Sequence, residues 1–304
     1  MSDRILPTND LCFKKIFADI SNLDILRGLI NDFFGLNPVD IIIQNPYSIE
    51  SYKKFLKEAE EKGESIILRQ TLRDVTANLI FADFTAEMQV TKTDFFGERS
   101  MYYTFDKYCQ NYGDELTLKI PQNLYSSLKP VYTLNILRYN AFENSDRAFR
   151  VFKIFDEEEQ KEFEPLTIRV AYFEILKTKA TNKNQEYWRE FFISGETDDT
   201  APDYIKRAAN VIKLVNMSEE ERAVAARVDK AIADYNAGIA TAKREGLIEG
   251  EIKGKLEGKL EDAVNIILDL GLTLSKVINT LRLPESARPD LIRELQARGI
   301  EYQP

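Results

Sequence analysis

The stretch 71–90, TLRDVTANLIFADFTAEMQV, decides how the rest of the chain is interpreted. It holds two β-rich runs that each carry an acidic residue inside an apolar pattern: Asp74 in the first run and Glu87 in the second. A carboxylate is costly among apolar residues unless it is solvated, paired or bound to a metal ion. These two acids are therefore the strongest functional signal in the sequence.

The spacing of the two runs predicts that the acids face each other. In an antiparallel hairpin that turns near Ile80 and Phe81, Asp74 and Glu87 are equally far from the turn and therefore lie opposite one another. The side-chain period of two places Gln89 on the same face as Glu87. Opposed side chains sit roughly 5 Å apart at Cβ, so the carboxylates repel each other unless a proton or a cation intervenes. The pair therefore predicts a divalent metal site.

The turn leaves an alternative open. It contains no Gly and no Asn-Gly pair to fix its length. A register slip of one residue would place the two acids on opposite faces of the hairpin. In a further alternative, the acids form no site and lie on an exposed edge of the hairpin.

Composition excludes several classes of function. Histidine is absent, which removes Ser-His, Cys-His and His-metal mechanisms and leaves carboxylate-metal chemistry for hydrolysis. Only Cys12 and Cys109 occur, without zinc-site spacing, so a reducing cytoplasm is the expected setting. The formal charge of −9 argues against a basic nucleic-acid coat but is compatible with a local basic groove. We expect neither secretion nor membrane insertion.

Several motifs in order resemble one family. Asp74, a short hairpin and Glu87-Met88-Gln89 resemble the core of the PD-(D/E)xK nucleases, in the Rpn variant of recombination-promoting nucleases or putative transposases, where Gln replaces the usual Lys. The resemblance extends to residues 8–17, which include Thr8-Asn9-Asp10 and Phe13-Lys14-Lys15-Ile16-Phe17, to Arg99 with Tyr102-Tyr103, and to the C-terminal segment rich in Gly, Lys and Glu. It covers most of the chain.

The resemblance implies both a fold and an activity. The fold is α/β, a mixed central β-sheet flanked by helices, with an α-helical C-terminal extension. The activity is metal-dependent endonucleolytic cleavage of DNA, of the type associated with recombination and transposases. Asp74, Glu87 and the backbone carbonyl of Met88 would bind Mg²⁺ or Mn²⁺. Gln89 occupies the position of the catalytic Lys; its amide can orient water but carries no charge, which predicts modest turnover.

Three further residues have two interpretations each. Asp10 matches the opening of the family and is a candidate metal ligand, but a role as a helix cap is the simpler and favoured explanation. Arg99 and Tyr103 are candidate contacts to substrate phosphate. The alternatives are an Arg on the exposed start of a helix and a Tyr in the core.

We expect a nuclease-like domain over 1–215 and a helical region over 216–304. In the first, helices are predicted from about Pro7 and from Asn22 to Gly35, and a short solvated helix or insertion over 47–65, with the sheet resuming at Ile66. A helix with heptad-like Met101, Phe105, Tyr108 and Tyr112 is predicted to end at Gly113. Further expected elements are inner strands over 131–137 and 166–176, a peripheral segment 142–161, a helix over 184–193 with Trp188 in the core, a linker over 197–202, and helical periodicity over 206–215.

The C-terminal region carries a glycine repeat. Gly246, Gly250, Gly254 and Gly258 recur every four residues and predict a glycine stripe on a helix, with an apolar stripe of Leu and Ile beside it. A partner packed against the small residues would offset their cost of about 1 kcal/mol each relative to Ala. The segment therefore predicts a homo-oligomer, and a mobile helical linker is the alternative.

The tail after residue 262 is expected to form short helices separated by Gly and Pro. The pattern predicts a small packing module, and a DNA-binding module is the alternative.

Two functions compete with the nuclease for the chain as a whole. One is a non-catalytic oligomeric scaffold built on a nuclease-like fold, and the other is a DNA-binding regulator acting through the C-terminal helices.

Overall fold

A computed structural model describes residues 5–62, 74–79, 81–115, 117–163 and 167–304. The chain divides into two compact units, Met1–Ala233 and Asp234–Pro304. The boundary expected between residues 215 and 216 stays a prediction.

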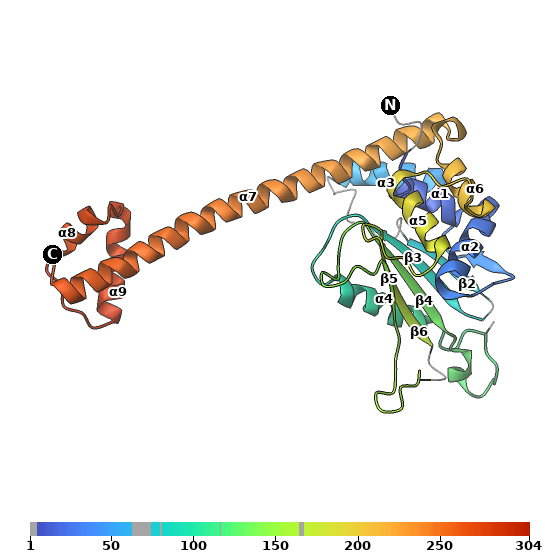
Figure 1. Cartoon of the computed structure of the whole chain (residues 1–304), viewed down its shortest axis with the longest axis horizontal. Coiled ribbons are helices and arrows are strands. Elements are labelled where there is room, and N and C mark those ends of the chain that lie inside the picture. The colour runs from blue at the N-terminus through green and yellow to red at the C-terminus, as the bar shows by residue number, and fades with distance from the viewer. Residues whose placement is uncertain (1–4, 63–73, 80, 116, 164–166) are drawn as a thin grey trace. The chain divides into compact units, whose positions relative to one another are not determined.

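A six-stranded mixed sheet forms the centre of the first unit (Figure 1), with the strand order β1-β2-β3-β4-β6-β5. Strands β3, β4 and β6 are parallel to one another, and the other neighbours are antiparallel. The strands are β1 (Ile41–Ile43), β2 (Asp74–Leu79), β3 (Asp83–Gln89), β4 (Val131–Leu137), β5 (Phe149–Phe152) and β6 (Ile168–Glu174). The expected inner strands β4 and β6 are confirmed; the expected strand start at Ile66 lies outside the described residues.

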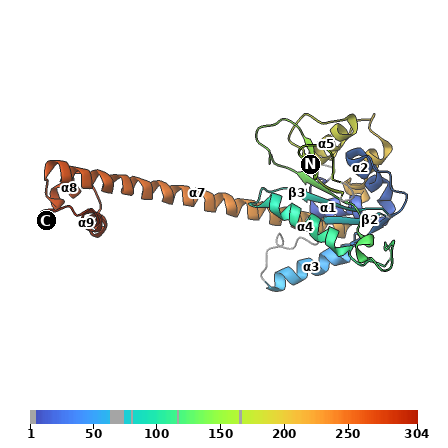
Figure 2. The same cartoon turned by 90° about the horizontal axis from the view of Figure 1, so that it is seen from below.

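Helices pack on both faces of this sheet. The main core joins one sheet face, including Phe84, Ala86 and Met88, to the apolar sides of several helices. These helices are α1 (Asp10–Ala18), α2 (Leu23–Phe34), α3 (Ile49–Lys62), α5 (Lys183–Ser194), α6 (Asp203–Val211) and the first turns of α7 (Glu219–Leu270). Helices α2 and α5 lie on one side of the strands and α4 (Phe96–Gln110) on the other (Figure 2). The expected α/β fold is confirmed.

Local sequence signals explain where α1 and α2 begin and end. Asn9 caps α1, because its side-chain oxygen accepts hydrogen bonds from the backbone N–H groups of Leu11 (3.1 Å) and Cys12 (3.4 Å). Gly35 ends α2 in the left-handed conformation (φ 68°), where its N–H donates to the Asn31 carbonyl at 2.8 Å. Both helices were expected at these places.

Helix α4 differs from its expected pattern. It ends at Gln110, three residues before Gly113. Of its heptad-like residues, Tyr108 packs against a small core cluster on this side of the sheet, whereas the other apolar residues of the pattern are exposed. Met101 and Phe105 are each 38 % exposed, whereas Ser100 and Thr104 are buried. The Thr104 hydroxyl lies 2.8 Å from that of Thr133 on β4. These small side chains let α4 pack closely on the sheet through hydrogen bonds, so hydrophobic periodicity selected the wrong face.

The segment 197–202 is not a linker between sub-structures. It joins α5 to α6 inside the first unit, and Ala201 is buried in the main core. The expectation for Trp188 is confirmed: its side chain is fully buried, and its Nε1–H donates to Asp32 Oδ2 at 2.8 Å. Tyr204 on α6 also donates to Asp32, so one buried carboxylate ties α2, α5 and α6 together.

The second unit has a small core of its own. The end of α7 packs with α8 (Leu274–Thr280) and α9 (Arg288–Ala297), as expected for a packing module. Buried residues of this core are Ala263, Val264, Ile267, Leu274, Val277, Ile278, Leu283, Ala287, Leu291 and Leu295. In the described part of the chain, no helix combines the length and apolarity needed to span a membrane.

The glycine repeat lies on α7 as expected. The apolar residues, however, are arranged around the helix differently from the expected pattern. Ile248 and Ile252 are two residues from the nearest glycines, and two residues correspond to about 200° around an α-helix. Ile248 and Ile252 therefore lie nearly opposite the glycine stripe, whereas Leu247, one residue after Gly246, lies beside it. At Gly250 and Gly254 an added Cβ would meet no atom within 4 Å.

Candidate active site

The hairpin formed by β2 and β3 has the register expected from the sequence. Leu79 and Ala82 exchange backbone hydrogen bonds of 2.8 and 3.4 Å, which closes the turn at the two residues between them. Of these, Phe81 is described and Ile80 lies outside the described residues. Asp74 is the pairing partner of Glu87. The predicted pairing is confirmed, and the slipped register is wrong.

Both acids therefore share one face of the sheet, the face that α4 covers. Directly opposed residues of an antiparallel pair project to the same side. Asn135 pairs with Glu87 across β4, and its Nδ2 donates to Ser100 Oγ on α4 at 2.9 Å. Glu87 is only 5 % exposed, whereas Asp74 is half-buried. The two acids therefore lie in a partly enclosed position, where β2 begins and β3 ends.

The backbone around Met88 and Asp74 is held in place. The Gln89 carbonyl accepts a hydrogen bond from the Arg138 N–H at 2.9 Å, on the β4 side of the strand. Successive carbonyls of a strand point in opposite directions, so the Met88 carbonyl points toward the β2 side, where Asp74 lies. Asn45 Nδ2 donates to the Asp74 carbonyl at 2.7 Å, and Asn45 Oδ1 accepts from the Thr76 N–H at 3.2 Å. Asn45 thereby fixes the start of β2.

The side chains that contact Glu87 include those of Gln89 and Arg99. Gln89 Nε2 donates a hydrogen bond to Glu87 Oε1. Arg99 Nη2 from α4 lies 3.6 Å from the same oxygen. Gln89 thus orients the neighbouring carboxylate, and Arg99 places a cation beside it.

Arg99 is partly buried and lies against an aromatic side chain. Its guanidinium lies 5.2 Å from the centre of the Phe96 ring. Its Nε and Nη2 atoms are buried and have no hydrogen-bond partner among the described residues. Burial raises the pKa of Tyr139, and the nearby Arg99 opposes this rise while Glu87 adds to it. Arg99, Tyr139 and Glu87 therefore form one electrostatic cluster.

A second cation approaches the acids from α1. Lys14 is only 4 % exposed. Burial lowers its pKa, and the negative charge of Asp74 opposes this effect, so the ammonium lies within electrostatic range of Asp74. Helix α1 is part of the core that covers the face opposite α4. The charge of Asp74 thus interacts with a cation from α1, and Glu87 lies beside a cation from α4.

The remaining sequence candidates have these positions. Asp10 is not the cap of α1, because Asn9 has that role; it is the first helical residue and is buried. Its part in metal binding stays a prediction. Tyr103 is not in the core, since it is 45 % exposed and its ring packs at 5.5 Å, edge to face, against that of Tyr102.

A comparison with protein-family models matches residues 7–242 to the PD-(D/E)XK nuclease family transposases. The chain belongs to this family. No curated protein and no solved structure shows significant similarity to it. The resemblance found on the short motifs of the sequence is confirmed.

The oxygen donors of this PD-(D/E)XK site fit a hard divalent cation. Asp74 and Glu87 are paired across the hairpin, and their carboxylates, like the Met88 carbonyl, offer the oxygen ligands that Mg²⁺ and Mn²⁺ prefer. Among the residues that the structure describes, no group of three or more Asp, Glu, Cys or His side chains has the geometry of a metal site. A cation here would therefore rely on Asp74, Glu87, the Met88 carbonyl and water.

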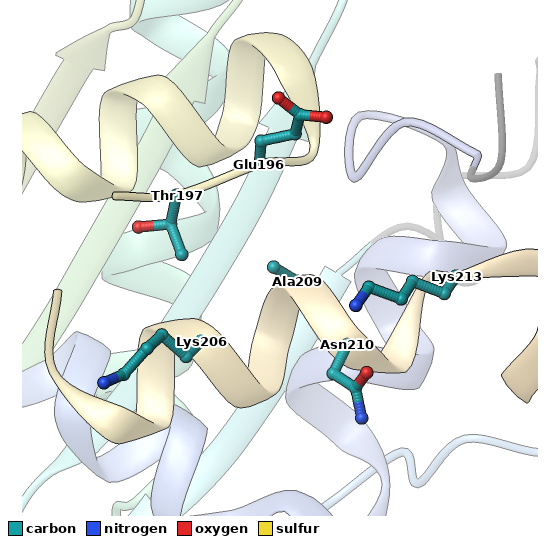
Figure 3. A pocket seen from close by; sticks show the side chains of 6 residues that line it. All are labelled: Glu196, Thr197, Lys206, Ala209, Asn210 and Lys213. Atoms are coloured by element: carbon teal, nitrogen blue, oxygen red, sulfur yellow. The ribbon is translucent and has the colours of Figure 1, made fainter. Parts of the chain in front are cut away.

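An open pocket of about 300 Å³ lies elsewhere in the first unit (Figure 3). Its lining comes from α6 and the residues around it: Glu196, Thr197, Lys206, Ala209, Asn210 and Lys213. None of these is a predicted site residue. Its lining includes two lysines, Lys206 and Lys213, and one carboxylate, that of Glu196.

Sequence reasoning missed two of the groups at the site. Asn45 precedes a proline in a loop, and nothing in its surroundings indicates that it holds the start of β2. Lys14 gave a weak signal, because it lies four residues after Asp10 and therefore on the same face of α1. A lysine on a face that also carries a buried acid is unusual on a helix that otherwise packs into a core.

Proposed function

We propose that the chain is a divalent-metal-dependent DNA endonuclease. The observation that carries this proposal is the pairing of Asp74 with Glu87 on one face of the hairpin, in a chain that belongs to the PD-(D/E)XK nuclease family transposases. Asp74, Glu87 and the Met88 carbonyl bind Mg²⁺ or Mn²⁺. Asp10 is a further candidate ligand.

The reaction is hydrolysis of a phosphodiester. The oxygen of a water molecule forms a bond to phosphorus, one ester P–O bond breaks, the water loses a proton, and the leaving alkoxide gains one. A bound metal ion supplies charge stabilisation on the phosphate and a lowered pKa of the water. Gln89 is a poor proton acceptor, and its role is to orient Glu87.

Arg99 and Tyr103 are proposed to contact the phosphate backbone of DNA. Arg99 supports this role because its buried guanidinium nitrogens lack hydrogen-bond acceptors among the described residues, and a phosphate oxygen would supply them. Tyr102 and Tyr103 are exposed on the next turn of the same helix, where aromatic rings can stack on unpaired bases. The substrate therefore approaches along the first turns of α4.

Plasmid nicking tests the proposal. Purified chain is incubated with supercoiled plasmid and Mg²⁺, and the Asp74→Ala and Glu87→Ala variants are compared with Asp203→Asn. Asp203 is 94 % exposed on α6, so its substitution removes a carboxylate charge away from the hairpin. We expect nicking by the wild type and Asp203→Asn only. Nicking that survives both hairpin substitutions would refute the proposal.

We also propose that the protein forms a homo-oligomer through the second unit. Leu247, Ile248 and Ile252 on α7 are between 52 % and 66 % exposed. Three large apolar side chains on one segment of a charged helix are typical of a surface that packs against a partner.

We further propose a cytoplasmic location, because the two free cysteines of the protein suit a reducing compartment.

A further inference from the structure

We propose that Lys14 is the cationic residue of the phosphodiester site, supplying from α1 the ammonium group that Gln89 does not carry. This inference rests on the proposed nuclease function. It assigns a role in the reaction to a residue outside the hairpin.

The first observation is the position of Lys14. Its side chain is almost completely buried, although a buried ammonium is costly without a nearby anion. Helix α1 packs against β2, the strand that begins with Asp74, and the negative charge of Asp74 favours the charged form of Lys14. Lys14 also lies four residues after the buried Asp10, so both project from the same face of α1.

The second observation is the contrast with the neighbouring lysine. Lys15 is 100° further round α1, and its Nζ forms an ion pair of 2.7 Å with Glu221 in the first turn of α7. Lys15 thus joins two helices. Lys14 lies on a different side of α1, and α1 packs against β2, the strand that carries Asp74.

The third observation is the chemistry of position 89. A side-chain amide has no positive charge, and in this structure it is bound to Glu87. Transfer of a phosphoryl group places negative charge on the phosphate oxygens, and a fixed ammonium is an effective partner for that charge. Lys14 donates a hydrogen bond to a non-bridging oxygen of the scissile phosphate as that charge develops.

The test measures kcat and KM on a short labelled DNA duplex with Mg²⁺. Lys14→Met is expected to lower kcat about 100-fold with little change in KM, as reported for removal of one preorganised oxyanion donor. Lys15→Met is the matched control, with the same change on the adjacent residue, and is expected to keep the wild-type kcat below its melting temperature. The double variant Lys14→Met/Gln89→Lys is expected to regain at least tenfold of the lost kcat, because the ammonium returns from β3.

A lysine with only a structural role gives a different result. In that case the loss follows the melting temperature, and Gln89→Lys does not restore cleavage. If Lys14→Met does not fold, Lys14→Arg is measured in its place. Arg keeps the positive charge beside Asp74 but replaces the compact ammonium group by a larger, planar guanidinium group. We therefore expect Lys14→Arg to fold normally and to have a kcat at least tenfold lower than that of the wild type.

The two proposals fail in distinguishable ways. A wild-type protein that does not cleave DNA refutes the nuclease. A wild type that cleaves, with Lys14→Met or Lys14→Arg equally fast, refutes the role of Lys14 alone.

Discussion

Arg99 Nη2 on α4 lies 3.6 Å from Glu87 Oε1 on β3. The Arg99 side chain is 32 % exposed, whereas that of Glu87 is 7 % exposed. The guanidinium therefore reaches from solvent to a nearly buried carboxylate. It can keep this contact and still present other N–H groups to an incoming phosphate.

Substitution of Arg99 tests its contact to DNA. Arg99→Met is expected to weaken DNA binding about 10-fold and to reduce by about one the slope of log affinity against log salt concentration. Lys107→Met removes one positive charge near the other end of the same helix and serves as the control. Fluorescence anisotropy with a labelled duplex measures both. An unchanged slope in Arg99→Met would show that Arg99 does not contact phosphate.

The ion pair between Lys15 and Glu221 predicts a pH-dependent contribution to stability. Burial disfavours the charged Glu221 side chain, but hydrogen bonds from Lys15, Tyr47 and the Ser218 N–H prevail and lower its pKa. A carboxyl group with a lowered folded-state pKa stabilises the fold above its ordinary pKa of 4.5 and loses this effect as pH falls further.

Glu221→Gln is accordingly expected to lower the free energy of unfolding by about 1–3 kcal/mol at pH 7. The difference from wild type should shrink below pH 4.5, where the wild-type carboxyl group becomes protonated. Urea unfolding at several pH values measures it. Glu219→Gln, which changes an exposed residue in the same turn, is the control. A deficit that stays constant down to pH 3 would contradict the ionic interpretation.

The two cysteines are predicted to differ in reactivity. Cys12 is fully buried, and burial together with the charge of Asp229 raises its pKa to about 12. Cys109 is exposed on α4. Because the thiolate is the reactive form, a thiol reagent should label one cysteine per native chain and two after unfolding. Mass spectrometry of the labelled peptides identifies the site. Rapid native labelling of Cys12 would show that α1 is not packed as described.

Assembly through α7 is predicted to depend on isoleucine and not on glycine. Ile248→Ser/Ile252→Ser should convert the oligomer to a monomer in sedimentation or light-scattering measurements. Gly250→Ala/Gly254→Ala should leave the oligomer intact, because these glycines lie on the opposite side of the helix and have open space around them. It should also stabilise the helix by roughly 1 kcal/mol per site. Dissociation caused by the alanines would indicate close packing on the glycine stripe.

The sequence predicted the hairpin well because its information is local. Asp74 and Glu87 lie symmetrically about a two-residue turn, and the period of a strand then determines the face they share. Gly35 and Asn9 similarly act within one turn of their own helices.

The remaining parts of the site depend on contacts between distant segments. Nothing local to Lys14 indicates that α1 brings it to Asp74, and nothing local to Asn45 indicates a bond to the start of β2. Arg99 was predicted as a phosphate contact, but its ion pair with Glu87 depends on how α4 packs on β4. That packing uses Ser100 and Thr104, which hydrophobic periodicity does not detect.

The proposed nuclease activity depends most on one metal ion held between Asp74 and Glu87. The most direct measurement is the single-turnover rate of DNA cleavage as a function of Mg²⁺ concentration, for the wild type and for Asp74→Asn. Asn keeps the size of the side chain and removes its charge. We predict that the wild-type rate rises with Mg²⁺ and saturates, and that Asp74→Asn is at least about 100-fold slower. Equal rates in the two proteins, or cleavage that persists in a metal chelator, would contradict the account.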